Sequence, residues 1–294
     1  MIILIGAFIV FGSVIGGFLM AGGHVPILIQ PSEYVLICGS ALGAMIIMAP
    51  KKVLKDMLAQ VIVAFKGTPF KRDAYNDMFK ALYEMFMLAR RSGMVALEEH
   101  VVSPSSSGLL AKYPAFTRNH HAIEFLCGAL RPIVDGKLKP DQLKGLLDTE
   151  LETLENEHHL PVSIMTKAAD AMPGFGIVAA VLGIVVTMGS ISGPVEEIGH
   201  HVAAALVGTF LGILISYGFL NPLAVNMEIT GASELAYLRC LATAVTGFAN
   251  GLAPAMALEA ARRSLTSEVR PSADELEAML KAATSQKSPE AMAA

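Results

Sequence analysis

Basic residues are confined to two parts of this chain. All 22 lysine and arginine residues lie within residues 51–167 and 239–287. Outside these two blocks the chain carries four long apolar runs, which cover residues 2–21, 34–49, 171–191 and 202–225. Each run is close to the roughly 17–25 residues that a helix needs to cross the hydrocarbon core of a bilayer. The pattern therefore predicts an all-α membrane protein with four transmembrane helices and a helical cytoplasmic domain.

The same distribution predicts the orientation of the chain. The loops that join the runs in pairs, at about 22–33 and 192–201, contain no lysine or arginine. Because cytoplasmic loops collect basic residues, both basic blocks and both termini are predicted to be cytoplasmic. The predicted divisions are two spans with a short outer loop, a cytoplasmic helical domain, two more spans with a short outer loop, and a cytoplasmic helix extension with a flexible tail, at residues 1–49, 50–170, 171–225 and 226–294.

Composition supports a lipid-embedded chain and excludes nucleic acid as a partner. Hydrophobic residues make up 53% of the chain and mean hydropathy is +0.54. Only 16% of residues are charged, against about 25% in ordinary soluble proteins. The net charge is −4 and no basic stripe is present. The first run lacks the basic start and the small-residue cleavage site of a signal peptide, so it is interpreted as a span.

The cytoplasmic blocks are predicted to be mostly helical, from their one-sided apolar patterns. A long helix is expected to continue after the fourth span and to bend near Gly251 and Pro254. Ser272 and Glu275 have the spacing of a capping box, which predicts a short helix to about residue 283, followed by a disordered end at 285–294. Other helices are expected at 73–99, 118–132 and 141–159.

Small residues recur at helical spacing in the third and fourth runs, where they allow two helix backbones to approach closely in lipid. Packing within the chain and a tight interface with another subunit are both consistent with this spacing. The residues concerned are Gly176, Ala180, Gly183, Thr187 and Ser190 in the third run, and Ala204, Gly208, Gly212 and Ser216 in the fourth.

Ionisable residues are absent from the middle of every run. Glu33 and His24 fall at the outer mouth. Proton relays in membranes are usually built on carboxylates or histidines, so an ion route would need an acid from a partner helix. Pro173 is expected at the first position of the third span and Pro222 at a kink near the end of the fourth, with a hinge at the inner membrane edge as the alternative.

Catalytic chemistry is not predicted. The sequence has no phosphate-binding loop, no metal-spaced Cys/His set and no nucleophile elbow. We therefore expect neither an enzyme nor a cofactor.

Several stretches together resemble the A subunit of the bacterial flagellar stator, the motility protein A family, over nearly the whole chain. The third and fourth runs alone also resemble the wider superfamily of proton-channel subunits that energise outer-membrane transport. The matching stretches are Gly16-Gly-Phe-Leu-Met-Ala-Gly-Gly23, Gln30-Pro-Ser-Glu33, residues 85–99, 172–180 and 207–214, Tyr217-Gly-Phe-Leu-Asn-Pro222 and Arg270-Pro-Ser272.

The resemblance implies a pentamer of this chain around a B subunit, in the bacterial cytoplasmic membrane. The B subunit would bring one span with an essential aspartate and a peptidoglycan-binding domain. Protons, with sodium ions as the alternative, would flow through the shared channel, and the pentamer would act on the rotor switch protein. By position, the resemblance assigns rotor contacts to Arg90 and Glu98. It assigns ion-pathway and coupling roles to Pro173, Ala180, Thr209, Tyr217 and Pro222.

Helical geometry competes with one of these assignments. On a continuous ideal helix, Arg90 falls on the apolar stripe with Phe79 and Phe86, whereas Arg91 falls on the polar face with Glu98. Arg91 is therefore a second candidate for the rotor contact.

Three other functions compete with a torque generator. An outer-membrane energising subunit is expected to have three spans, so four spans argue against it. A secondary transporter is expected to show broken helices or internal repeats, which are not clear here. An inert membrane scaffold fits only if the small residues serve packing alone.

Overall fold

The computed structural model describes residues 2–285 and divides the chain into two compact units. Unit 1 contains Met1–Gly67 and Asn156–Gly231, and unit 2 contains Thr68–Glu155 and Ala232–Ala294. The described residues are helical apart from turns and short connections, and no strand occurs among them. The all-α prediction is confirmed.

Unit 1 holds the apolar helices. It begins with α1 (Ile2–Met20), the 3-10 helix η1 (Val25–Leu28), α2 (Pro31–Met48) and α3 (Lys51–Lys66). The second part of α8 (Pro140–Gly189) and α9 (Val195–Ile215) follow. A π-helical segment, η5 (Ser216–Leu220), then joins α9 to α10 (Asn221–Ala249). Four stretches in these helices are long and apolar enough to cross a membrane, which confirms the predicted spans.

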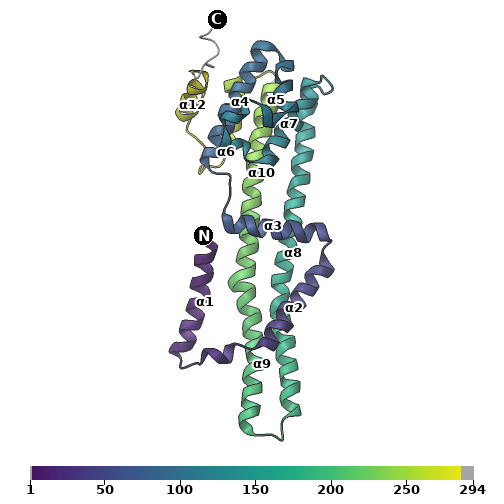
Figure 1. The fold of residues 1–294 in the computed structure, drawn as a ribbon, viewed down its shortest axis with the longest axis vertical. Coiled ribbons are helices and arrows are strands. Elements are labelled where there is room, and N and C mark those ends of the chain that lie inside the picture. The colour runs from purple at the N-terminus through teal and green to yellow at the C-terminus, as the bar shows by residue number, and fades with distance from the viewer. Residues whose placement is uncertain (1, 286–294) are drawn as a thin grey trace. The chain divides into compact units, whose positions relative to one another are not determined.

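Helix α3 was not singled out by the sequence. In Figure 1 it runs crosswise to α8 and to the helix formed by α9 and α10. Its Met57 and Ala64 are buried in a cluster with Val162 and Met165 of α8 and Leu223 of α10. A 16-residue helix therefore packs against the long helices instead of continuing α2.

Helix α8 corrects one prediction. The third span was expected to begin near residue 171, with Pro173 at its first helical position. Instead α8 is one helix of 50 residues, and both Pro161 and Pro173 lie inside it. Proline inside a helix removes one hydrogen bond, but neighbouring helices make this tolerable in membrane segments.

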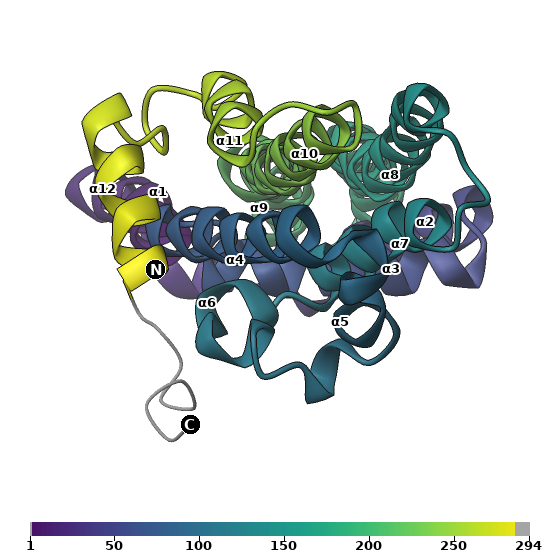
Figure 2. The same ribbon diagram turned by 90° about the horizontal axis from the view of Figure 1, so that it is seen from above.

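Unit 2 is built around α4 (Arg72–Ser92), as Figure 2 shows. The short helices η2 (Met94–Leu97), α5 (Glu98–Val102), η3 (Pro104–Ser106), η4 (Leu110–Lys112) and α6 (Pro114–Thr117) follow, and then α7 (His120–Val134). After α10 come α11 (Pro254–Arg263) and α12 (Ala273–Ser285), which both contact α4. The core includes stacked rings of Phe86 and Phe248, whose centroids are 4.1 Å apart.

Two glycines shorten the helices expected in unit 2. The helix predicted over 73–99 ends at Ser92, because Gly93 has a φ of +86° that L residues rarely adopt. The helix predicted to bend near Gly251 is interrupted there, since α10 ends at Ala249 and α11 begins at Pro254.

The predicted capping box is confirmed. The backbone N–H of Glu275 donates to Ser272 Oγ at 3.1 Å, and the N–H of Ser272 donates to Glu275 Oε2 at 2.7 Å. Ser285, expected to be disordered, ends α12, and the rest of that predicted tail lies outside the described residues.

Candidate functional site

Helices α8 and α9 meet through small residues, and we call this contact the small-residue seam (Gly176, Gly183, Ala205, Gly208 and Gly212). A β-carbon at Gly176 would lie 2.9 Å from the carbonyl oxygen of Gly208. One at Gly183 would lie 2.6 Å from the β-carbon of Ala205. Such distances leave no room for side chains, so these glycines serve packing within the chain. Their predicted use as an interface with another subunit is not needed to explain their spacing.

Thr209 also belongs to this contact, whereas Ala180 is only half-buried. The Thr209 hydroxyl donates to the carbonyl oxygen of Gly176 at 3.3 Å, which ties α9 to α8. By contrast, Thr187 Oγ1 donates within its own helix, to the Gly183 carbonyl at 2.8 Å. Thr209 is therefore the hydroxyl that joins the two helices.

Glu33 is a buried carboxylate that sequence reasoning left at the outer mouth. It lies in the first turn of α2, and only 7% of it is exposed. Its Oε2 lies against Gly208, within clashing distance of a β-carbon placed there, and finds no hydrogen-bond partner among the described residues. The glycine at 208 therefore makes room for an acid. The available signal was a glutamate inside an apolar helix, two residues after Pro31.

Buried polar atoms without a partner occur in α9 and at the start of η5. His201 Nδ1 and Ser216 Oγ have no hydrogen-bond partner among the described residues, and Ser216 is fully buried. At about 100° per residue, positions 201, 208 and 216 fall on one side of the helix. The Glu33 carboxylate reaches this same side at Gly208. Since buried polar atoms normally have partners, this row departs from ordinary helix packing.

Pro222 follows a local change of helix type. The N–H of Asn221 donates to the carbonyl of Ser216, five residues earlier, at the end of η5. This wider turn provides the helix adjustment that was predicted at Pro222. Tyr217 lies in the π segment with 62% of its surface exposed. The Asn221 side chain donates to Asp170 Oδ1 of α8 at 3.2 Å, which links the two helices beside the proline.

The sequence-predicted ion-pathway residues therefore have different surroundings. Thr209 lies in the small-residue seam, and Tyr217 and Pro222 lie at the π segment. Pro173 is half-buried inside α8, one residue after Met172, whose carbonyl faces Gly212. Ala180 is half-buried in α8.

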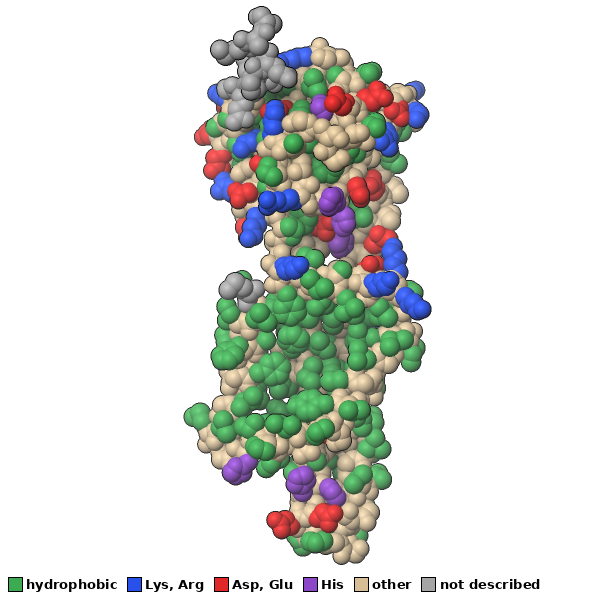
Figure 3. All heavy atoms as spheres, viewed as in Figure 1, with side chains coloured by type: hydrophobic (Ala, Val, Ile, Leu, Met, Phe, Trp, Pro, Cys, Tyr) green, Lys and Arg blue, Asp and Glu red, His purple; other side chains and the backbone are tan. Residues whose placement is uncertain are grey.

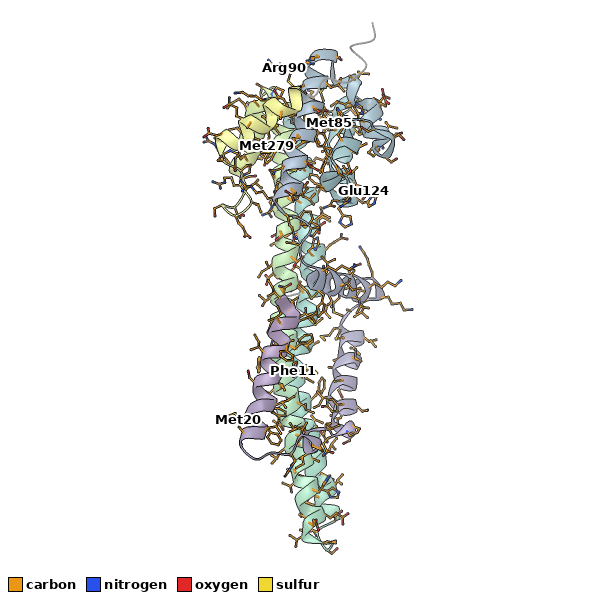
Figure 4. All side chains as sticks on the ribbon, turned by 60° about the vertical axis from the view of Figure 1, so that its left-hand side comes forward. Phe11, Met20, Met85, Arg90, Glu124 and Met279 are labelled. Atoms are coloured by element: carbon orange, nitrogen blue, oxygen red, sulfur yellow. The ribbon has the colours of Figure 1, made fainter. Side chains whose placement is uncertain are left out.

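A second candidate surface lies in unit 2, at the turn between α4 and α5. Arg90 and Arg91 are in the last turn of α4, and Glu98 and Glu99 are in the first turn of α5. Figure 4 labels Arg90 at the end of its helix. All four side chains are exposed, and none forms an ion pair within residues 2–285. Leu97 is fully buried and anchors the connection.

Arg90 and Arg91 do not differ in exposure, although the ideal-helix geometry placed them on different faces. Arg90 was placed on the apolar stripe, yet both arginines are exposed. Ala89 is the last buried residue of α4, and Arg90 in the last turn of that helix is exposed. Exposure therefore does not separate the two candidates.

Metal chemistry finds no support in the part of the chain that is described. Across residues 2–285, no three His, Cys, Asp or Glu side chains gather in a group that could hold a metal ion.

Comparisons with known proteins cover almost the whole chain. The family model described as Motility protein A N-terminal matches residues 4–93, and the model described as MotA/TolQ/ExbB proton channel family matches residues 118–229. The curated Motility protein A of Salmonella typhimurium is 36% identical over 96% of both chains. Chemotaxis protein LafT of Vibrio parahaemolyticus is 34% identical over 94% of this chain and 97% of its own.

Solved structures agree. The flagellar MotAB stator complex from Bacillus subtilis contains a chain with a TM-score of 0.72 and 25% identity, covering 93% of this chain and 97% of its own. A chain of C. jejuni MotAB has a TM-score of 0.76 at 21% identity and covers 92% of this chain and 98% of its own. At 21% identity, the likeness to the C. jejuni MotAB chain concerns the fold alone.

Proposed function

Because this chain belongs to the motility protein A family and is a proton-channel subunit of the flagellar stator, we propose how its residues carry ions and pass on torque. It is a multi-pass protein of the inner membrane, and its family is one of channel subunits and not of enzymes. The charge distribution supports an orientation with both termini and the basic blocks in the cytoplasm. The curated relatives and the four candidate spans favour a stator subunit over a subunit that energises outer-membrane transport.

The ion route runs along one side of α9. The observation that carries this proposal is the row of unpartnered buried atoms, His201 Nδ1, Glu33 Oε2 and Ser216 Oγ. Polar atoms in a membrane segment are costly, so their placement on one side indicates use. Thr209 and Tyr217 lie along the same helix and its continuation. Glu33 accepts and releases protons near the outer end of this row.

A B subunit completes the route. The acids that this chain offers near the route are Glu33 in the first turn of α2 and Asp170 beside Asn221 at the inner end, and the middle of the route lacks one among the described residues. A partner helix with an aspartate supplies it there, as a stator B subunit with one span and a peptidoglycan-binding domain would. Helix α1 has no buried residue and α8 exposes Ile177, Val181 and Ile184, so apolar surface remains for further subunits. Several copies of the chain, five by the family resemblance, surround the B subunit.

Torque passes through a hinge at η5 and Pro222, and then through the charged turn between α4 and α5 (Arg90, Arg91, Glu98 and Glu99). Pro222 and η5 provide a helix segment whose hydrogen bonds can change between π and α spacing. Pro173 lies inside the facing helix α8. Arg90, Arg91 and Glu98 then meet complementary charges on the rotor switch protein, because exposed charge pairs of about 0.2–1 kcal/mol each can form and break repeatedly.

Proton flux into cells tests the shared channel. Expressed alone, the chain is expected to leave cytoplasmic pH unchanged, since it lacks an acid in the middle of the route. Expressed with an unplugged B subunit, it is expected to acidify the cytoplasm, as read by a pH-sensitive fluorescent protein. The control is a B subunit whose membrane aspartate is replaced by asparagine. Acidification by the chain alone would overturn the proposal.

A further inference from the structure

Helix α3 has a side that the rest of unit 1 leaves uncovered. Its buried side, Met57 and Ala64, packs against α8 and α10. Leu58 and Ile62, four residues apart on another side, are 60% and 54% exposed. The helix begins at Lys51, three residues after the end of the α2 span at Met48. An apolar stripe thus starts where the chain leaves the membrane.

Two contacts fix which way α3 is turned. Lys52 Nζ pairs with Glu157 Oε1 of α8 at 2.9 Å, and Gln60 Nε2 donates to the His158 carbonyl at 3.4 Å. Residues 157 and 158 precede the part of α8 that packs against Met57, and the apolar run of α8 follows it. At about 100° per residue, Leu58 lies across the helix from the midpoint between Lys52 and Gln60. Leu58 therefore faces along α8 toward the membrane run.

Lysines flank this apolar stripe. Lys51, Lys55 and Lys66 are exposed and have no ion pair within the described residues. At about 100° per residue, all three lysines fall within about 40° of Ile62, and Lys66 lies at the opposite end of the helix from the Lys52–Glu157 contact. Figure 3 shows basic side chains gathered at the edge of the hydrophobic surface, toward the start of α3. Lysine stems can lie along an apolar surface while their ammonium groups reach the headgroups.

We propose that α3 is an anionic-lipid binding site, in which Leu58 and Ile62 enter the acyl region of the inner leaflet while Lys51, Lys55 and Lys66 hold the phosphates of anionic phospholipids. A helix with an apolar stripe and flanking lysines lies in the plane of the interface, and each lysine near an anionic surface adds attraction. The inference rests on the membrane orientation proposed above.

The absence of tryptophan from the chain allows a direct test. The full chain is purified with Leu58→Trp as its one tryptophan and reconstituted into phosphatidylethanolamine vesicles with a tenth of the lipid brominated. The quencher is carried by phosphatidylglycerol or, in a parallel sample, by phosphatidylcholine. We expect brominated phosphatidylglycerol to quench the fluorescence of the introduced tryptophan about twofold more strongly than brominated phosphatidylcholine does. This excess should disappear in high salt.

Two controls separate the parts of the inference. Val63→Trp lies roughly 140° around the helix from position 58 and is expected to be quenched much less. In the Leu58→Trp chain, replacing Lys51, Lys55 and Lys66 by Gln is expected to remove the phosphatidylglycerol excess. The same replacement at Lys71, Lys139 and Lys144 of unit 2 removes equal charge and is expected to leave the excess intact.

Equal quenching at positions 58 and 63 would overturn the membrane placement of α3. Equal quenching by the two lipids would overturn the recognition of anionic headgroups, and the salt series decides this even if the triple variant fails to fold. Proton flux with the B subunit is measured separately, so either failure is distinguishable from a failure of the stator function.

Discussion

Gly212 of α9 faces the backbone of α8 so closely that a β-carbon at position 212 would lie 2.7 Å from the carbonyl oxygen of Met172. Backbone cannot move aside as a side-chain tip can, so the two helices would have to separate. We expect Gly212→Leu to destabilise unit 1 by at least about 1–3 kcal/mol and to abolish motility. Thermal unfolding in detergent and swimming in soft agar measure these effects.

The neighbouring position is the matched control. Ile213 is 46% exposed, and Ile213→Leu conserves volume, so stability and swimming are expected to remain near normal. If Gly212→Leu and Ile213→Leu were tolerated equally, the close contact of α8 and α9 would not be required.

Glu33 is expected to limit proton flux. Glu33→Gln keeps the shape of the side chain in its niche against Gly208 but removes the exchangeable proton. We expect proton flux with an unplugged B subunit to fall roughly tenfold or more, with the protein still in the membrane, since proton-transfer groups typically contribute about 10²–10⁴. Cytoplasmic acidification is the readout. Glu33→Asp should retain part of the flux, and full flux in Glu33→Gln would remove this residue from the route.

The charged turn of unit 2 is expected to act only on torque. A proton crossing about 150 mV delivers roughly 3–4 kcal/mol, at ~2.3 kcal/mol per 100 mV. Charge reversal at Arg90, Arg91 or Glu98 should impair swimming while membrane insertion and proton flux stay normal, because these side chains are exposed. Motility assays of single reversals then show which arginine meets the rotor.

Reversal of an exposed lysine elsewhere in unit 2, Lys139→Glu, is the control and should swim normally. A compensating reversal on the rotor switch protein should restore part of the torque lost in Arg90→Glu or Arg91→Glu. Loss of expression in these variants would instead mean that the arginines hold the fold.

The contact between α11 and the segment that precedes α12 should lose stability in acid. Hydrogen bonds from Arg262 and Arg263 hold the pKa of Glu259 at about 2, and Arg262 also donates to the Pro271 carbonyl at 3.0 Å. Because the folded pKa lies below the unfolded value near 4.5, this contribution is complete above pH 4.5 and is lost as pH falls toward 2. Glu259 is partly exposed, so solvent screening reduces the contribution to roughly 1 kcal/mol.

Unfolding of the full chain in detergent, followed from pH 7 to pH 2, measures this effect. We expect Glu259→Gln to lower the unfolding temperature by about 2–4 °C at neutral pH and to match the original chain near pH 2. A difference that does not change with pH would show that the carboxylate charge is not responsible.

The features that were predicted correctly from the sequence are those that depend on nearby residues in the chain. The four spans follow from apolar length, and the capping box at Ser272 and Glu275 follows from hydrogen bonds within one helical turn. The wrong predictions depend on distant partners. Pro173 read as a helix start because neighbouring helices, which make an internal proline tolerable, are not visible in a sequence.

The candidate site was predicted only in part for the same reason. The glycine spacing could be read from single helices and Thr209 was assigned by the family resemblance, but the burial of Glu33 requires α2 to meet α9 at Gly208. Arg90 keeps its ideal-helix position in α4 but is exposed, because the position of a residue around a helix does not say whether other elements cover the last turn. Its rotor contact, like the other assigned roles, stays a prediction.

The π segment also sets the rotational phase of everything that follows it in this helix. One extra residue in a turn rotates the later part by about 100° relative to an uninterrupted α-helix. Leu223, Ala224 and Met227 reach their buried cluster only with that offset. Converting η5 to α spacing at unchanged length would rotate these side chains away from their cluster, whereas deleting Gly218 together with the wide turn would keep them in phase. The choice between π and α spacing thus decides which face the start of α10 turns to its neighbours in unit 1, independently of any side chain in the segment.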